Sequence, residues 1–253
     1  MILDRFRLDG QVAVVTGGNR GLGLSLSEGL AQAGAHIVSV QHGASAPELA
    51  KCVAAAGRHS LAVGANLKEE SSAQKVLDAA LAEFGRVDIL VNNAGIQRRT
   101  PSEAFSLADW DEVMAVNLRA VFLYCQVFGR HFLAQGRGKI INMASLQSLI
   151  GGWTIPAYTA SKHGMAGLTK TLCNEWAGRG VNINCISPGY MDTEMNAALK
   201  ANPERSRTIN DRIPAGRWGL PEDLAGAAVF LASPASDYVN GHILVVDGGW
   251  MAR

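Results

Sequence analysis

The chain has 253 residues, with 23 Lys and Arg against 22 Asp and Glu, and 48% of its residues are hydrophobic. Charges so nearly balanced give no broad attraction to nucleic acid or to an anionic membrane surface. No Pro/Ser-rich linker or shift in composition divides the sequence. We therefore expect a single enzyme-sized α/β domain over residues 1–253, with a substantial core.

The start of the chain, MILDRFRLDG, has neither the long apolar core nor the processing site of a targeting segment, and no later run is long enough to span a bilayer. A cytoplasmic protein with no membrane association is the expectation. The cysteines, Cys52, Cys125, Cys173 and Cys185, are far apart and lack metal-ligand spacing. They are predicted to be buried thiols, and no metal site is expected.

Strand-like apolar runs alternate with stretches of helical spacing. The runs lie at 11–16, 36–40, 60–65, 87–92, 139–144, 181–186 and 242–247. Between them, SAQKVLDAALAEFG and the long DWDEVMAVNLRAVFLYCQVFGRHFLAQG have helical periodicity. Apolar strands separated by helices predict a single Rossmann-like doubly wound α/β domain, in which a seven-stranded parallel sheet is flanked by helices. Ligands in such folds bind beyond the carboxyl ends of the strands.

A glycine-rich turn follows the first strand, in the segment VAVVTGGNRGLGLSL. Gly17, Gly21 and Gly23 allow a close backbone approach, and the following helix offers unpaired N–H groups and the positive end of its dipole. The spacing is G-x-x-x-G-x-G, not the common G-x-G-x-x-G, and a plain flexible turn is the alternative interpretation. Strand before and helix after favour a cradle for the diphosphate of a dinucleotide.

Tyr158 and Lys162, in the stretch YTASK, are four residues apart on a predicted helix, so the phenol and the ammonium should lie on one face. A fixed positive charge favours the phenolate and should lower the pKa of Tyr158 from its ordinary value of about 10. Such a pair could exchange protons near neutral pH. The same spacing also occurs on many solvated helix faces, so its weight depends on the rest of the chain.

TGGNRGLG, NNAG, Asn117, Ser145, YTASK and SPGY occur in the order and at about the spacing found in the short-chain dehydrogenase/reductase family, which the chain resembles over nearly its whole length. The resemblance implies that Ser145 holds the substrate oxygen and that Tyr158 is the acid/base. It also implies that Lys162 assists Tyr158 and holds the nicotinamide ribose, while Asn117 supports a water leading protons to Lys162. Alone, Ser145 could be a strand cap and Asn117 a satisfied polar core residue.

The same resemblance implies a nicotinamide cofactor held at the carboxyl ends of the strands. The residues expected to bind it are Gly17, Asn19, Arg20, Gly21, Leu22, Gly23, Gln41, His42, Asn66, Leu67, Asn93, Ala94, Gly95, Tyr158, Lys162, Pro188, Gly189, Met191 and Thr193.

The choice between the two nicotinamide cofactors depends on the end of the second strand. Members of the family often have there an Asp for the ribose diol of NAD or an Arg for the phosphate of NADP, whereas this chain has Gln41 and His42. Arg20 is the nearby cation that could favour NADP. Asn66 stands where the family usually has Asp. The expectation is NAD, with NADP possible.

The C-terminal stretch DRIPAGRWGLPEDLAGAAVFLASPASDYVNGHILVVDGGWMAR, with NAGIQRR and LCNEWAGRGVNINCISPGYM, is similar to the group of 2-deoxy-D-gluconate 3-dehydrogenases, also called 2-dehydro-3-deoxy-D-gluconate 5-dehydrogenases. This resemblance implies hydride transfer at a ketone or secondary alcohol of a deoxy keto sugar acid formed in uronate degradation. A sugar acid needs a cation and polar groups. The candidates are Arg98, Arg99, Gln147, Trp153 and Tyr190, with the arginines facing solvent as the alternative.

Two other functions stay open from the sequence. One is a short-chain reductase acting on another polyol, keto acid or acyl substrate. The other is a dinucleotide sensor without catalysis, since a fold does not by itself define function. A sensor would need the glycine loop but no proton donor, so the intact set of Ser145, Tyr158 and Lys162 favours an enzyme.

The chain end, ILVVDGGWMAR, places Trp250 where a polar, frayed tail is common. Exposed Trp and Met are typical of subunit contacts. Together with the apolar positions Val121, Phe122 and Leu172, and with the assembly common in the resembled family, this predicts a homotetramer. The alternative is that these helix faces cover their own sheet.

Overall fold

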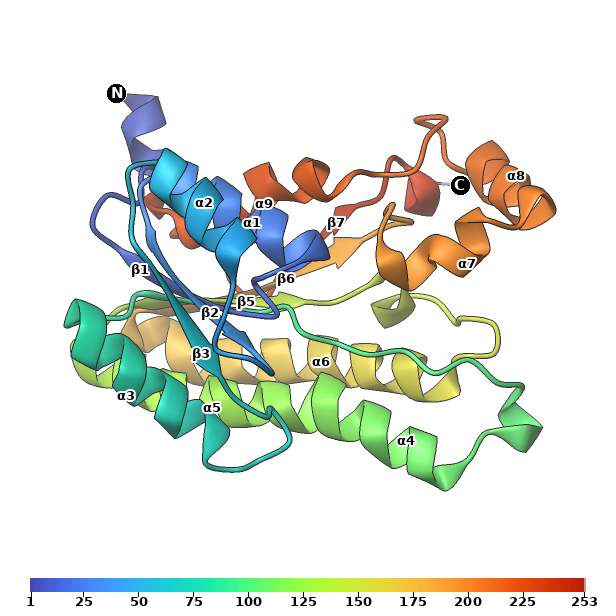
Figure 1. Ribbon diagram of the computed structural model, residues 1–253, viewed down its shortest axis with the longest axis horizontal. Helices are drawn as coiled ribbons and strands as arrows, with labels where there is room; N and C mark the ends of the chain where they lie inside the picture. The colour runs from blue at the N-terminus through green and yellow to red at the C-terminus, as the bar shows by residue number, and fades with distance from the viewer. Residues whose placement is uncertain (253) are drawn as a thin grey trace.

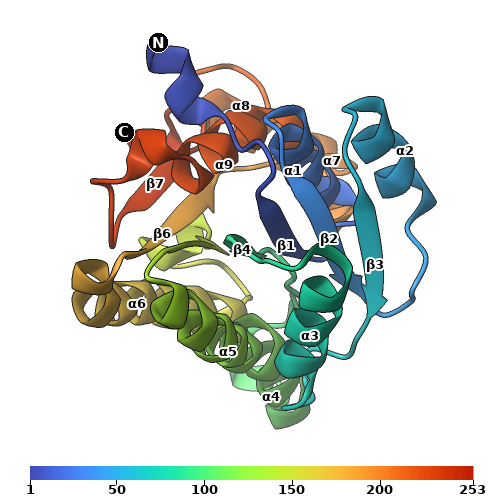
Figure 2. The ribbon, with the colours of Figure 1, turned by 90° about the vertical axis from the view of Figure 1, so that its left-hand side faces the viewer.

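The sheet predicted from the apolar runs is present in the computed structural model, which describes residues 1–252. Seven parallel strands follow the order β3-β2-β1-β4-β5-β6-β7 (Figure 2). They are β1 Val12–Thr16, β2 His36–Gln41, β3 Ser60–Gly64, β4 Ile89–Asn92, β5 Gly138–Met143, β6 Val181–Pro188 and β7 Ile243–Val246. The seven-stranded, doubly wound α/β fold is confirmed.

Helices cover both faces of the sheet, because every central strand is apolar on both sides (Figure 1). One layer comprises α1 Gly21–Gln32, α2 Pro47–Ala55 and α9 Ala225–Ala232, and its core includes Leu26, Leu30 and Ile89. The opposite layer comprises α3 Ser72–Phe84, α4 Leu107–Met114, α5 Ala120–Gln135 and α6 Pro156–Trp176. Two short helices, α7 Ala197–Lys200 and α8 Pro203–Arg212, lie beyond the carboxyl end of β6.

The long helix predicted over residues 109–136 is interrupted. A π-helical turn, Ala115–Arg119, separates α4 from α5 and buries Asn117 completely. Wide turns of this kind occur often at functional sites. The periodicity of apolar residues could not predict this π-helical turn, because hydrophobic residues continue on both sides of it.

The C-terminal segment folds back onto the body of the protein. Trp250 is only 5% exposed and packs in a small third apolar cluster with Leu146, Ile209, Ile213 and Trp218. The prediction that Trp250 is an exposed subunit contact is therefore wrong for this residue, because its indole ring closes an internal gap beside α8.

The helix positions named as possible subunit contacts behave differently from one another. Val121 and Leu172 are 4% and 6% exposed and cover their own sheet, whereas Phe122 is 42% exposed. Of the cysteines, Cys125 and Cys185 are buried, Cys52 and Cys173 are half-buried, and all four are free thiols. Within residues 1–252, no helix has both the length and the apolar character needed to cross a bilayer.

Candidate active site

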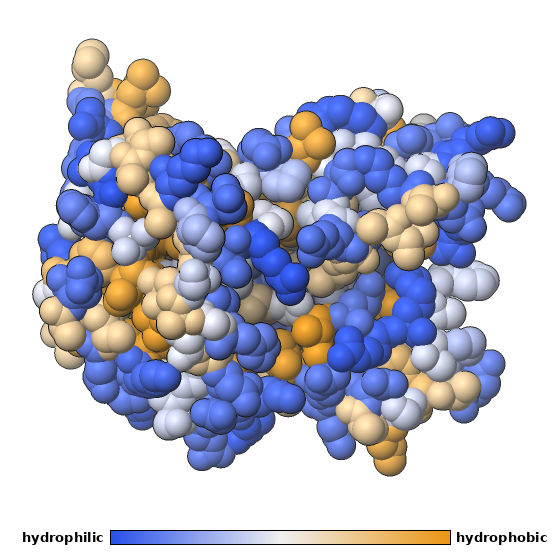
Figure 3. Space-filling model, in the orientation of Figure 1, coloured by the Kyte–Doolittle hydropathy of each residue, from blue (hydrophilic) through white to orange (hydrophobic). Residues whose placement is uncertain are grey.

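A cavity of about 1180 Å³ lies beyond the carboxyl ends of the strands. The chain runs outward from β1 through β2 to β3 and then crosses back to β4, so the strand order reverses between β1 and β4. Ligands of open α/β sheets bind at such a reversal. Figure 3 shows the hollow on this face of the molecule, with hydrophilic side chains around its opening and the α7–α8 lobe above it. We call it the central cavity.

The glycine loop at one end of the central cavity is built to bring backbone close to a ligand. Gly17 has φ +66°, and a Cβ on Gly23 would lie 2.0 Å from the carbonyl oxygen of Gly17, so a side chain at position 23 is excluded. Asn93 fastens the loop, since its amide donates to the carbonyl oxygen of Thr16 at 2.9 Å. Arg20, the N-cap of α1, makes no side-chain cap, which leaves the first N–H groups of the helix available for an anion. The loop fits a dinucleotide diphosphate.

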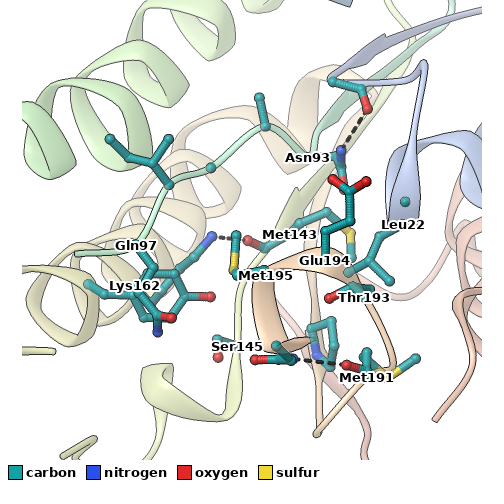
Figure 4. A pocket seen from close by; sticks show the side chains of 18 of the residues that line it. Leu22, Asn93, Gln97, Met143, Ser145, Lys162, Met191, Thr193, Glu194 and Met195 are labelled. Atoms are coloured by element: carbon teal, nitrogen blue, oxygen red, sulfur yellow. Dashed lines mark hydrogen bonds between the residues drawn. The ribbon is translucent and has the colours of Figure 1, made fainter. Parts of the chain in front are cut away.

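Lys162 lies inside the protein, where the residue as a whole is only 4% exposed. Its Nζ donates to the carbonyl oxygen of Met143 at 2.5 Å (Figure 4). The same atom lies 5.6 Å from the centroid of the Tyr158 ring. Burial disfavours the charged form and lowers the pKa of Lys162 to about 8. An ammonium with such a pKa can hold or release a proton near neutral pH.

Tyr158, on the first turn of α6, lines the central cavity beside Ser145. Burial raises the pKa of its phenol, and a hydrogen bond with the Ser145 hydroxyl offsets part of that rise. The expectation that the lysine would lower this pKa is wrong for this arrangement, because the ammonium is bound to the Met143 carbonyl and desolvation of the phenol dominates. The phenol is thus held as a proton donor, with Ser145 beside it.

Asn117 lies behind this group and does not border the central cavity. Its side chain forms two bonds with the backbone of Ile96, accepting from the N–H at 2.8 Å and donating to the carbonyl at 2.9 Å. It also donates to the Ser161 hydroxyl at 3.3 Å. Asn117 therefore ties the wide turn to the segment after β4, and through Ser161 to α6.

At the other end of the glycine loop, Gln41 and His42 line the central cavity at the end of β2. The side-chain Oε1 of Gln41 accepts from the Ser39 hydroxyl at 2.6 Å. The Nε2 donor of the same amide is buried and has no partner among residues 1–252. Asn66 is engaged locally, since its Nδ2 donates to Glu69 at 3.2 Å and its Oδ1 accepts from the N–H of Lys68 at 3.2 Å.

The structure brings most of the predicted site residues to one cavity. Apart from Asn117, all residues predicted to bind cofactor or to take part in catalysis line it. Of the predicted substrate residues, Arg99, Gln147, Trp153 and Tyr190 also line it. Arg98 does not border the cavity. Its guanidinium pairs with Glu112 at 2.7 Å and with Asp109 at 3.5 Å, which leaves it unsuited to bind a substrate carboxylate.

Sequence reasoning missed the wall contributed by the α7–α8 lobe and the chain end. This wall includes Met195, Leu199, Arg205, Thr208, Ile209, Arg212 and Trp250. A signal was present in the sequence, because Arg205, Thr208 and Arg212 recur at helical spacing in PERSRTINDR, but that stretch is polar and carries no motif. Gln97, after NNAG, was also missed.

Comparison with known proteins agrees with this geometry. A family model described as enoyl-(acyl carrier protein) reductase matches residues 17–251. The chain is 52% identical to 2-dehydro-3-deoxy-D-gluconate 5-dehydrogenase of Escherichia coli K12 and 48% identical to the protein of that name from Bacillus subtilis 168. The first alignment covers 100% of this chain and 100% of the relative, and the second covers 99% of this chain and 98% of the relative.

A solved structure of gluconate 5-dehydrogenase from Burkholderia cenocepacia J2315, in complex with NADP and tartrate, superposes with a TM-score of 0.95 at 45% identity and covers 100% of both chains. The chain belongs to the short-chain dehydrogenase/reductase family. It is an oxidoreductase that uses a nicotinamide cofactor.

Proposed function

We propose that this enzyme transfers hydride between NADP and the C5 position of a deoxy keto sugar acid, as a 2-dehydro-3-deoxy-D-gluconate 5-dehydrogenase. The observation that carries the proposal is that one cavity contains both the Ser145–Tyr158 hydroxyl pair and, farther along, a guanidinium, Arg99, with no acidic partner within residues 1–252. The first group suits a carbonyl that becomes an alcohol, and the second suits an acid. The two full-length relatives named above have this activity in their names.

The side chains that line the central cavity have different roles, which depend on their positions. NADP, when bound along the glycine loop, supplies or accepts the hydride. The Ser145 hydroxyl would donate a hydrogen bond to the substrate oxygen, and Tyr158 would give that oxygen a proton in reduction and take one in oxidation. Lys162, with its pKa lowered to about 8, would hold the nicotinamide ribose and resupply the proton.

NADP replaces the NAD expected from the sequence. The expectation of NAD was drawn from Gln41 and His42, which supply neither the Asp nor the Arg often found after β2, but solved relatives contain NADP. Supporting this assignment, Gln41 presents an unpartnered buried amide donor at that position and carries no charge to repel a phosphate. Arg20 stands at the same end of the central cavity, in an exposed pair with Glu194 at 3.4 Å.

A substrate panel tests the proposal. Purified enzyme should oxidise 2-dehydro-3-deoxy-D-gluconate with NADP, followed by NADPH absorbance. The kcat/KM should be higher than for a neutral polyol or a 3-hydroxyacyl thioester. A clear preference for a neutral polyol or a thioester would contradict the proposal and favour a different short-chain reductase. No turnover of any member, with tight NADP binding, would instead favour a sensor.

We place this reaction in the cytoplasmic breakdown of uronates and propose a homotetramer as the working assembly. Support for assembly comes from Phe122 on α5, which is 42% exposed. Deletion of the C-terminal residues 248–253 would be a poor test of the tetramer. Trp250 lines the central cavity, so the deletion would also disturb the active site. Sedimentation of wild type and Phe122→Glu is the better test. A wild-type monomer at micromolar concentration would refute the tetramer, and an unchanged tetramer in the variant would remove Phe122 from the interface.

A further inference from the structure

One face of α8 points into the central cavity. Arg205, Thr208, Ile209 and Arg212 all line it, and their spacing of three, four and seven residues places them on a single helical stripe. Ile209 is 6% exposed and anchors the helix in the small apolar cluster with Trp218 and Trp250. The charged members of the stripe are thereby held above the cavity, opposite the segment that follows β4.

Arg99 reaches the same region from that segment. Its Nη1 donates to the carbonyl oxygen of Trp153 at 3.2 Å and to the Thr154 hydroxyl at 3.4 Å. Thr154 has φ +59°, the left-handed region that a β-branched residue rarely adopts. The N–H of Thr100 fastens this turn by donating to the Thr154 carbonyl at 2.9 Å. Strain of this kind persists where the surroundings impose it, and it is frequent at binding sites.

The charges of the two arginines are not balanced by acids. Within residues 1–252, neither Arg99 nor Arg205 forms an ion pair, whereas Arg98 is paired with two carboxylates, one of them from Glu112 at the cavity wall. Burial and the nearby charge of Arg205 both lower the pKa of Arg99, which shows that the two guanidiniums repel each other. An anion between them would remove that cost.

The floor beside the two arginines is aromatic. The Tyr190 ring lies 4.6 Å from the Trp250 ring, centroid to centroid, and the Arg212 guanidinium stacks 4.2 Å above Trp250. Aromatic faces suit the C–H surface of a sugar chain, and the phenol of Tyr190 adds a polar group. Gln147 supplies a further polar side chain, with its buried Oε1 unpartnered among the described residues.

From this geometry we infer that Arg99 and Arg205 together bind the carboxylate of the substrate, with Arg205 reaching it from α8. The inference deepens the proposed function and rests on it, since it assigns the acid end of a sugar acid whose other end meets Ser145 and Tyr158. It makes the α7–α8 lobe the element that distinguishes an acid from a neutral polyol.

The experiment compares Arg205→Gln and Arg99→Gln with wild type on 2-dehydro-3-deoxy-D-gluconate and on its primary amide, which keeps the carbon chain and loses the charge. Loss of a charge-assisted hydrogen bond should raise KM for the acid by about tenfold to a hundredfold, with kcat changed little. KM for the amide should stay within about twofold. Arg207→Gln removes the same charge from an exposed position of α8 and should match wild type on both compounds.

A binding measurement separates this inference from the proposed function. Tartrate, a hydroxy acid anion, is titrated calorimetrically into each NADP-saturated protein. Weaker tartrate binding to Arg205→Gln but not to Arg207→Gln would support the carboxylate site. If wild type also failed to oxidise the deoxy keto acid, the proposed function would be refuted while the carboxylate site would still be supported. Unchanged KM and unchanged tartrate affinity in both cavity variants, in an enzyme that does oxidise the acid, would overturn the inference alone.

Discussion

The ammonium of Lys162 is bound to the carbonyl oxygen of Met143, the last residue of β5, and not to the phenol of Tyr158, its partner on α6. The cost of this burial should appear in the stability of the protein. The pKa of Lys162 is about 8 in the folded state, compared with 10.5 as its ordinary value. At 1.36 kcal/mol per pKa unit, burial of the charged ammonium lowers the free energy of unfolding by about 3 kcal/mol.

The sign of the effect follows from proton counting. Between pH 8 and 10.5 the unfolded chain binds more protons at this lysine than the folded chain does, so this residue makes the free energy of unfolding rise with pH. Below pH 8 the penalty is complete and constant. Lys162→Met should therefore be more stable relative to wild type at neutral pH than at about pH 10, as measured by urea unfolding. Lys170→Met, an exposed change on the same helix, should show no such trend.

Tyr158→Phe removes the proposed proton donor while leaving the ring. Turnover should fall by about a hundredfold or more, the effect expected of a general acid, with the affinity for NADP unchanged. Tyr238 is fully exposed and remote from the cavity, so Tyr238→Phe serves as the matched control. Turnover within a few-fold of wild type in Tyr158→Phe would remove this residue from the chemistry.

Gln41→Asp should reverse the cofactor preference. The new carboxylate would repel the 2′-phosphate of NADP and accept from the ribose diol of NAD, so the ratio of kcat/KM for NADP to that for NAD should fall by about tenfold or more. Gln126→Glu, which adds the same charge at an exposed position of α5, controls for net charge. A ratio that stays constant would place the adenosine ribose elsewhere.

Gly23→Ala tests how closely the start of α1 packs against the glycine loop at Gly17. The added methyl would lie 2.0 Å from the Gly17 carbonyl and 2.6 Å from the Asn93 amide, so loop and helix must separate. We expect a large loss of NADP affinity, measured by fluorescence titration, and a lower melting temperature. Gly226→Ala in α9 meets no atom within 4 Å and should stabilise the protein by about 1 kcal/mol. If the two variants had equal NADP affinity and equal melting temperature, the close packing of Gly23 against Gly17 would be contradicted.

The sheet could be predicted because each strand is a continuous apolar run next to turn residues, and this pattern reflects burial on both faces. The glycine loop and the YTASK helix could be placed for a similar reason, since their spacing has a local physical meaning. Their assignment to binding and catalysis stays a prediction until the variants above are measured.

Features that depend on distant parts of the chain could not be read in the same way. Arg98 and Arg99 are identical in type and adjacent, and only the fold shows that Asp109 and Glu112 neutralise the first. Trp250 was expected outside because it stands near the chain end, but the apolar space beside α8 decides its position. The pKa of Tyr158 was expected to fall because a lysine lies four residues away, yet desolvation outweighs that neighbour.

The π-helical turn at Ala115–Arg119 also sets the rotational phase between two helices. Each residue of an α-helix turns it by about 100°, so an extra residue accommodated in this turn fixes which face of α5 meets the sheet. Tyr124, Phe128 and Phe132 are fully packed there, and Asn117 is locked to Ile96 at the cavity. A one-residue deletion in the turn would thus have to give up either the packing of the aromatic side chains or the anchoring of the asparagine. The length of this segment is constrained by core and site together, even where the identity of its residues is not.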